Sequence, residues 1–481
     1  MKLFHLAYLI MLISSNAWSV SQELTVSGWP KEWLQMDSKS PHWANNPVLG
    51  KMICPALTRL NLLEKRSEAQ LLSEIKVSDR EQKVWSFVLS KDLYWWTGDI
   101  VTHEDLANFF DKNLEQNLRQ SSMDSYEIPN FDIEHSKLGV KIIWKSKPKF
   151  GPWILNQIPF QKQKDGKIVC AGNWQPQQLT GYIEEMISKA PESTMSIKFT
   201  AQKSADLSFQ YPHSSIANAW ARHPDQRIRC SRKIDLPIIT GIFWNTNMPD
   251  TNNPKMRAAF THLMPRGALL RHGAGYMGDL LSGPFLRAHP GYSKALLVKS
   301  YSVETAQKIF AQQNYRYKEA NGELMRPDGT NLVLKIQVRG SRETLAEKVI
   351  ASSFQSSGIT VEFQSQPQGA HGILTSLTLP WPNGNLIHAL HSKSKSSWPG
   401  QFATEQLDNG LEAYARSLTF SKPDFRQLRK IHKILFDQEP ITLLMQHQVC
   451  LKSRSRKKLP KVYIRNPDWF QKLTKFTMRT K

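Results

Sequence analysis

Cysteine is scarce in this chain of 481 residues, with only Cys54, Cys170, Cys230 and Cys450. No two of them have the CxxC spacing, and no histidine pattern completes a zinc site around them. The cysteines therefore give no support for a structural metal. Cys170 and Cys230 are a candidate disulfide pair, and buried free thiols are the equal alternative.

Long apolar runs are also missing, and none approaches the ~20 residues that a membrane-spanning helix needs. A shorter, mostly apolar stretch at residues 3–13 follows Lys2 and precedes a small, polar segment that ends at Ser19. A charged start, a short apolar run and an Ala-x-Ser pattern are typical of a secretory signal. We expect residues 1–19 to be cleaved and the mature protein to be soluble in the periplasm.

Catalytic motifs are absent as well, since the chain has no GxSxG, HExxH or Walker A sequence. The acidic segment 103–105 is typical of the first turn of a helix, with Thr102 as N-cap and Asp105 three residues later. His388 and His391 lie three residues apart, which alone is weak support for a metal site. We therefore predict no enzyme activity, no catalytic residue, no metal and no cofactor.

Acidic residues are few relative to basic ones. The chain has 41 Asp and Glu against 63 Lys and Arg, which gives a formal net charge of +22. The basic residues are spread out, and the densest runs are 227–233 and 452–458. No nucleic-acid recognition module accompanies them, so we expect no nucleic-acid partner. A solvated basic surface is the first interpretation. The alternative is an envelope sensor or scaffold that binds anionic polymers.

One glycine pattern invites a nucleotide-binding interpretation: Gly273, Gly275 and Gly278 have the GxGxxG spacing. That pattern binds a dinucleotide only where a strand enters it and a helix follows. Here a predicted helix over 255–270 precedes the glycines, and a Ser-Gly-Pro turn follows them. We expect a connecting loop and no phosphate site.

Alternation and helical periodicity predict a mixed α/β protein in at least two lobes. A strand–helix–strand series in the second half reads as a βαβ unit. The predicted strands are 85–89, 140–144, 197–200, 237–244, 332–338, 359–363 and 440–445, and the predicted helices include 303–313, 342–354 and 424–436.

Tryptophan is abundant, with 15 residues, and several lie beside Gly, Pro or Asn at the ends of predicted elements. Aromatic side chains in such places can wall a binding cleft, and the alternative for each is a place in a core. The candidate ligand-binding residues are Trp96, Trp244, Asn245, Trp381, Asn383 and Trp398.

Four segments, in this order, resemble the family 5 extracellular solute-binding proteins, which serve ABC importers for oligopeptides, dipeptides and nickel. Residues 85–105 are similar to the family's W-x-F-x-L signature that ends in T-x-x-D. Asn245 followed by Arg257-Ala258 resembles its F-N to V-R-x-A segment. Residues 304–315 and 345–362 resemble its E-x-A helix and its helix–G-I-x-V-E unit.

The resemblance implies two α/β lobes of the class II-like periplasmic binding protein type, with mixed sheets flanked by helices and a hinge cleft. It implies lobe I over 20–240 plus 445–481, with an inserted subdomain at about 50–165, and lobe II over 241–444. It also implies a monomer that passes a peptide or other small molecule to an ABC permease in the inner membrane.

The ligand of this chain is expected to differ from a simple peptide. Peptide-binding members pair the ligand's amino group with an acid in a D-Y-x-x-P segment, and Pro380 stands at that position here, followed by Trp381. Proline carries no charge to hold a cation. A modified peptide, a non-peptide solute or a loss of transport are the alternatives.

Overall fold

The structure is a computed structural model. It describes residues 22–27, 53–61, 64–78, 81–115, 128–148, 151–156, 158–165, 167–172, 174–179, 182–188, 195–200, 207–210, 232–273, 278–285, 287, 289–339, 345–378, 390–392, 402–418 and 422–453.

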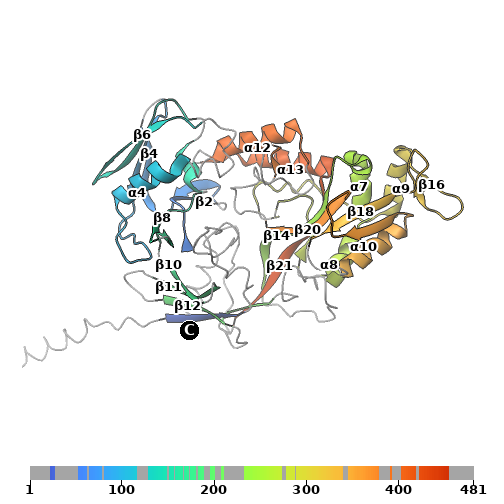
Figure 1. Cartoon of the computed structure of the whole chain (residues 1–481), viewed down its shortest axis with the longest axis horizontal. Coiled ribbons are helices and arrows are strands. Elements are labelled where there is room, and N and C mark those ends of the chain that lie inside the picture. The colour runs from blue at the N-terminus through green and yellow to red at the C-terminus, as the bar shows by residue number, and fades with distance from the viewer. Residues whose placement is uncertain are drawn as a thin grey trace, which may run out of the picture.

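A large mixed sheet of 11 strands runs through the molecule (Figure 1). Its path is β10 (Trp174–Leu179), β11 (Tyr182–Ser188), β12 (Met195–Thr200), β1 (Gln22–Ser27), β13 (Leu207–Gln210), β21 (Ile441–Ser453), β14 (Arg232–Trp244), β20 (Gly372–Thr378), β18 (Val333–Val338) and β19 (Thr360–Gln364), and β15 (Gly278–Asp279) pairs with β21. The two longest strands, β14 and β21, therefore stand between the strands of one lobe and those of the other.

The smaller sheets lie on either side of this one. The four-stranded sheet contains β4 (Leu72–Val77), β5 (Val84–Leu89), β7 (Gly139–Trp144) and β6 (Phe131–Ser136). The two-stranded sheets pair β2 (Thr58–Asn61) with β3 (Arg66–Ala69), β8 (Gln161–Lys164) with β9 (Lys167–Cys170), and β16 (Arg316–Tyr317) with β17 (Leu324–Met325).

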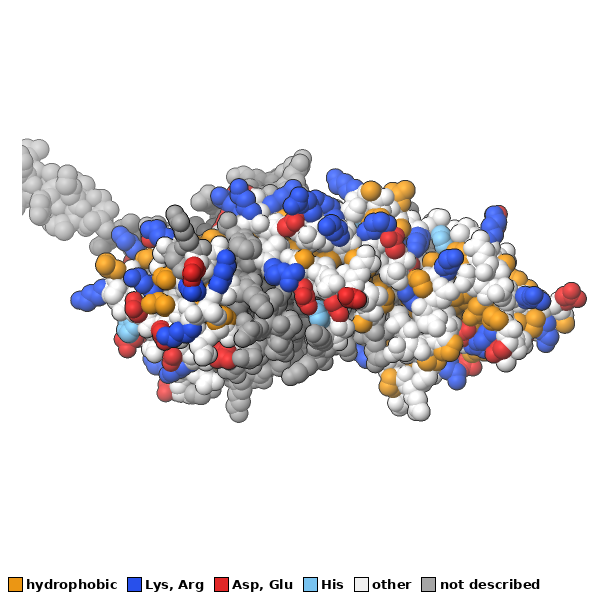
Figure 2. Space-filling view, turned by 90° about the horizontal axis from the view of Figure 1, so that it is seen from above, with side chains coloured by type: hydrophobic (Ala, Val, Ile, Leu, Met, Phe, Trp, Pro, Cys, Tyr) orange, Lys and Arg blue, Asp and Glu red, His pale blue; other side chains and the backbone are white. Residues whose placement is uncertain are grey.

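The helices flank the sheets. They are α4 (His103–Phe109), the π-helical turn η2 (Phe110–Leu114), the 3-10 turn η4 (Pro152–Asn156), α6 (Pro249–Asn252), α7 (Pro254–His262), α8 (Arg266–Gly273), α9 (Val303–Gln312), α10 (Leu345–Gln355), α12 (Glu405–Leu418) and α13 (Phe425–Gln438). The pair α12 and α13 lies at the top of the molecule in Figure 1, on the side that Figure 2 views directly.

Two hydrophobic cores share the central strands. On β14, Ile239 and Phe243 belong to the core that contains the first half of the chain together with α12 and α13. Ile242 and Trp244 belong to the second core, formed with α7, α9, α10 and β18. Alternate residues of a strand point to opposite faces, so this strand supports both cores. The lobe boundaries drawn from the sequence stay a prediction, and α12 and α13 share the first core.

Pairing between β14 and β21 is antiparallel, and its register shifts twice, with the second shift between Thr240 and Gly241. Arg232 lies opposite Leu451 and Phe243 opposite Ile441, but the register shifts between Asp235 and Ile239. Four residues of β14 advance there while β21 advances two, from Gln448 to Gln446. The strands are thus continuous while their ladder is not.

Several predicted elements are confirmed. The βαβ unit is β18, α10 and β19, with the two strands parallel and Leu334 opposite Val361. The capping box at α4 is present, since the Thr102 side chain accepts from the Asp105 backbone N–H and the Asp105 side chain accepts from the Thr102 N–H. The late helix begins at Phe425, after an Asp424 N-cap.

The single helix predicted over 255–270 is wrong. The segment forms two helices, because α7 ends at His262 and α8 begins at Arg266. Pro265 lies between them. Proline disfavours the helical conformation of the preceding residue and has no N–H to donate, so a continuous helix is interrupted there.

The candidate disulfide between Cys170 and Cys230 is also wrong, because Cys170 bonds to Cys54, with a Cα–Cα distance of 5.1 Å. Trp96 lies beside this bond. Its backbone N–H donates to the Cys170 carbonyl, and its indole Nε1 donates to the Ile53 carbonyl. Cys450 is disulfide-bonded as well. The sequence separation of 116 residues concealed the pair that the fold brings together.

Within the described part of the chain, no helix combines the length and the apolar character required to cross a bilayer. The predicted signal segment 1–19 lies outside the described residues.

A buried histidine gives a pH-dependent stability. His432 of α13 is fully buried, and its Nδ1 accepts from the Ser293 backbone N–H at 3.0 Å, which requires an unprotonated nitrogen. Burial lowers the pKa of His432 to about 4. The unfolded chain binds a proton near pH 6.5, so folding loses stability as pH falls from 6.5 toward 4.

We predict that this residue alone removes about 2 kcal/mol of unfolding free energy between pH 7 and pH 5. Urea denaturation at both values, for the parent and for His432→Gln, measures it. The unfolding free energy of His432→Gln should differ less between pH 7 and pH 5 than that of the parent protein. Equal pH dependence in both proteins would contradict the assignment.

Candidate ligand-binding site

Asn245 follows the last residue of β14, and its polar groups are used to hold that end of the strand. The backbone N–H donates to the His371 carbonyl at 2.8 Å, and Nδ2 donates to the Ala370 carbonyl at 3.2 Å. The side-chain oxygen accepts from the Asn247 backbone N–H at 3.1 Å. Asn245 therefore joins the end of β14 to the start of β20.

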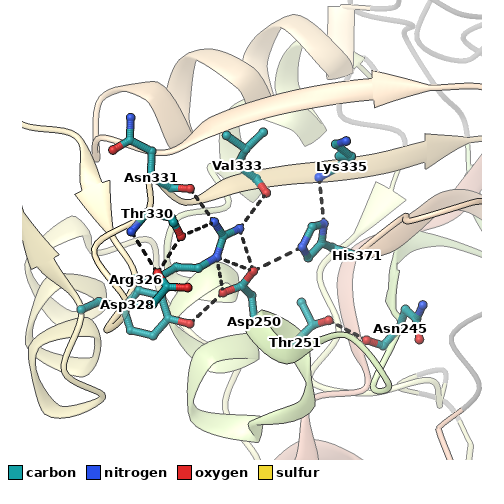
Figure 3. Close-up of polar contacts among 11 residues, drawn as sticks. Asn245, Asp250, Thr251, Arg326, Asp328, Thr330, Asn331, Val333, Lys335 and His371 are labelled. Atoms are coloured by element: carbon teal, nitrogen blue, oxygen red, sulfur yellow. Dashed lines mark hydrogen bonds and ion pairs between the residues drawn. The ribbon is translucent and has the colours of Figure 1, made fainter.

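A buried ionic cluster lies next to this junction (Figure 3). Asp250 of α6 is 3% exposed, and its carboxylate accepts from Tyr315 Oη at 2.9 Å and from Arg326 Nε at 3.0 Å. Arg326 Nη2 also lies 2.9 Å from the carboxylate, and His371 Nε2 lies 3.3 Å from it. Four donor groups thus converge on a single carboxylate.

The tautomer of His371 follows from its second contact. Its Nδ1 accepts from the Lys335 backbone N–H at 3.1 Å, so the ring proton is on Nε2, which donates to Asp250. Burial opposes ionisation of Asp250, but hydrogen bonds from His371, Arg326 and Tyr315 outweigh it and hold the pKa of this carboxyl well below its usual range.

The Asp250 carboxylate is therefore ionised and saturated with donors. It has no lone pair left for a metal ion or for a substrate proton, and the same burial and hydrogen bonding raise the pKa of Tyr315. Arg326 also donates to the Asn331 carbonyl, which ties the turn after β17 to the cluster. The cluster is a rigid support for this end of lobe II.

The two predicted tryptophans within the described residues lie in separate cores. Trp244 is 0% exposed, its Nε1 donates to Thr442 Oγ1 at 2.9 Å, and its ring packs 5.3 Å from that of Phe260. Trp96 is 7% exposed in the other core. Trp381, Asn383 and Trp398 lie outside the described residues. The ligand-binding role of the six residues stays a prediction.

Strand register places Asn245 just beyond one end of the β14–β20 pairing. Trp244 lies opposite Gly372, while Ile238, at the other end of this pairing, lies opposite Thr378. Six residues of strand separate the two ends, which is roughly 20 Å. Of the predicted residues, Trp244 and Asn245 are neighbours at the outer end of β14.

Within this pairing, the structure brings together three polar side chains that the sequence interpretation missed. Thr240 Oγ1 lies 2.6 Å from Ser376 Oγ and 2.6 Å from His447 Nε2, so one hydrogen-bonded chain spans β20, β14 and β21. Thr240 and His447 are buried. A threonine inside an otherwise apolar strand was the only signal in the sequence.

Close packing explains the last glycine of the pattern, Gly278. Helix α8 precedes it and β15 follows it, which is the reverse of the order in a dinucleotide-binding turn. Gly278 pairs with His447, and a Cβ on it would lie 2.8 Å from the Gln446 carbonyl oxygen. The glycine is required because two backbones approach each other there.

The acidic segment at the start of α4 also has a structural role. Asp105 accepts from Trp95 Nε1 at 3.1 Å and from Lys162 Nζ at 2.9 Å, and that ammonium lies 4.3 Å from the centre of the Trp95 ring. These contacts fasten the β8–β9 hairpin to the loop before α4. Within the described residues, no group of three His, Cys, Asp or Glu side chains could hold a metal ion.

We predict that Asp250→Asn destabilises the protein by roughly 2 kcal/mol, because it leaves the partly buried Arg326 charge without its ionised partner. Chemical unfolding followed by tryptophan fluorescence measures the change. Glu304→Gln is the control, since it removes an exposed carboxylate paired with Lys308 within α9. Equal unfolding midpoints for the two variants would show that the Asp250 cluster carries no stability.

The sequence itself matches no protein-family model and none of the curated proteins. The structure resembles solved binding proteins over nearly its whole length. An oligopeptide-binding ABC transporter protein from Thermotoga maritima superposes with a TM-score of 0.67 at 16% identity, covering 95% of this chain and 98% of that one. A nickel ABC transporter protein from Bacillus halodurans superposes with a TM-score of 0.64 at 13% identity, covering 92% of this chain and 98% of that one. The periplasmic binding protein DppA from Helicobacter pylori, in complex with a peptide, superposes with a TM-score of 0.63 at 13% identity, covering 94% of this chain and 97% of that one. The chain has the two-lobed α/β fold of these periplasmic binding proteins, as the sequence predicted.

Proposed function

We propose that this chain is exported by its N-terminal signal, works as a monomer in the periplasm, and captures a peptide-like or other small solute between its lobes. It then delivers the solute to an ABC permease in the inner membrane. The supporting observation is the fold, which binding proteins for an oligopeptide, for nickel and for EDTA share over 92–95% of this chain.

Binding without chemistry is consistent with the side chains that the structure describes. Asp250, whose pKa is held well below its usual range, already accepts hydrogen bonds from Tyr315, Arg326 and His371. It cannot accept a ligand's ammonium group in addition. Affinity in such a site comes from backbone hydrogen bonds and from aromatic walls that exclude water. We assign the walls to Trp381 and Trp398 and a polar contact to Asn383.

The charge of the solute follows from Pro380. A buried ammonium without a counter-charge is costly, so a proline in place of the acid disfavours a free amino terminus. A peptide with a blocked amino terminus, or a solute that is neutral or anionic there, fits better. The basic composition of the chain also favours an anionic solute.

Native mass spectrometry of the mature protein, purified from its own envelope, is the direct experiment. We expect a discrete added mass that is lost on mild denaturation, and we expect the released solute to lack a free amino terminus. An apo mass, together with no thermal shift against peptide and metal panels, would overturn the proposal in favour of an envelope scaffold.

A single substitution tests the aromatic wall. Trp381→Ala should raise the Kd of the released solute by about tenfold or more, because a flat apolar contact is lost. The melting temperature should not change. Leu138→Ala, which truncates a side chain that is 85% exposed, is the matched control and should bind as the parent does. An unchanged Kd for Trp381→Ala would remove this residue from the site.

A further inference from the structure

Helix α13 and the loop 289–301 form one continuous surface. Arg429 Nη1 donates to the Pro290 carbonyl at 3.4 Å, and the Ser293 N–H donates to His432 at 3.0 Å. Further along, Lys299 Nζ lies 3.5 Å from the Phe436 carbonyl oxygen. The loop therefore follows the helix over most of its length. We call this the α13 surface.

The inner side of α13 is fixed in the core, so its outer side is held toward solvent. Leu428, Ile431 and Leu435 are buried, whereas the charged residues between them are exposed. Figure 2 views this side, and Lys and Arg side chains outnumber Asp and Glu across its centre. The exposed charged residues of the α13 surface are Lys294, Lys422, Arg426, Arg429, Lys430, Lys433 and Asp437, with Asp424 at the N-cap.

Most of this positive charge is uncompensated. Arg426 pairs with Asp424 at 2.9 Å, and Lys433 pairs with Asp437 at 2.8 Å. Among the residues that the structure describes, no carboxylate pairs with Lys294, Lys422, Arg429 or Lys430. Six cations therefore face two carboxylates, and the surface carries a net charge of +4.

The loop also exposes apolar side chains. Leu297 is 76% exposed and Tyr301 is 49% exposed. Lys299 lies between them in sequence and reaches the carboxyl end of α13, where it pairs with Glu439. Leu297 and Tyr301 lie on the loop that runs along this basic helix, and an exposed leucine and tyrosine are side chains that enter the interfacial layer of a bilayer. The Tyr301 hydroxyl is 3.5 Å from Ser353 Oγ of α10.

We propose that the α13 surface docks on the surface of an anionic phospholipid bilayer. Charge complementarity supplies the attraction, and each cation near such a surface increases partitioning by about fivefold. A bilayer accepts Leu297 and Tyr301 without a matching pocket, whereas an acidic protein face would need one for each. Binding is peripheral and reversible, and it is independent of what the lobes capture.

Sedimentation of the mature protein, without residues 1–19, with vesicles tests this proposal. The protein should bind phosphatidylcholine vesicles that contain phosphatidylglycerol, should not bind phosphatidylcholine alone, and should be released by salt. The triple variant Lys294→Glu, Arg429→Glu, Lys430→Glu should lose at least about tenfold in affinity. The double variant Leu297→Ser, Tyr301→Ser should also bind more weakly.

The matched control is Lys91→Glu, Lys141→Glu, Lys147→Glu, which changes the total charge equally at exposed sites around the four-stranded sheet. It should keep the parent affinity, because charges beyond about 8 Å are screened at physiological salt. An equal loss in both triple variants would overturn the proposal in favour of a general field effect.

Two further results would also overturn it. One is binding to vesicles that is unaffected by the triple variant in the α13 surface. The other is an unchanged vesicle affinity of the double variant combined with competition by soluble polyglutamate, which would indicate an acidic protein partner. Thermal melts verify that each variant is folded, and Lys294→Gln, Arg429→Gln, Lys430→Gln replaces the charge reversal if it is not. Solute capture by native mass spectrometry should be unchanged in every variant, which separates this proposal from the proposed function.

Discussion

The pairing of β14 with β21 is the interaction on which both lobes depend. The two strands occupy the middle of the large sheet, and each contributes side chains to both cores. Ile239 and Phe243 serve one core and Ile242 and Trp244 the other. Loss of the ladder between them would therefore disturb both cores.

Buried charge in lobe II is stabilised by complete hydrogen bonding. Asp250 receives donors from three side chains, and the 1% exposed Arg257 donates to main-chain carbonyls at the end of α6 and at the end of α13. Burial lowers the pKa of Arg257 to about 10, which still leaves it charged at neutral pH. Each such group joins segments distant in sequence, since 181 residues separate Arg257 from Gln438. The polar interior thus specifies how helices and strands meet.

Local patterns predicted local structure well. Thr102 and Asp105 signalled the start of α4, and alternation with a helical period found the unit β18–α10–β19. The helix expected over 255–270 failed because periodicity was given more weight than Pro265. In each case the deciding contact lies within a few residues in the chain.

Long-range features could not be predicted in this way. Cys54 and Cys170 are neighbours only because the segment 53–57 and the β8–β9 hairpin pack together. Trp244 has the same neighbours in sequence whether it lines a cleft or fills a core, and its Thr442 partner lies 198 residues away. The Thr240–His447 contact joins residues 207 apart. A candidate site is built from such contacts, so sequence patterns gave its residue types and left its geometry open.

The shifted register between Asp235 and Ile239 has a mechanical consequence. An uninterrupted antiparallel ladder resists bending because many hydrogen bonds must distort together. Where two extra residues stand on one strand and Pro237 has no N–H to give, fewer bonds oppose a change of angle. The ribbon of β14 and β21 is therefore less stiff at this shift than along its regularly paired stretches. Bending of the ribbon at this interruption distorts fewer hydrogen bonds than bending along its regularly paired stretches, while β14 and β21 each keep an unbroken chain.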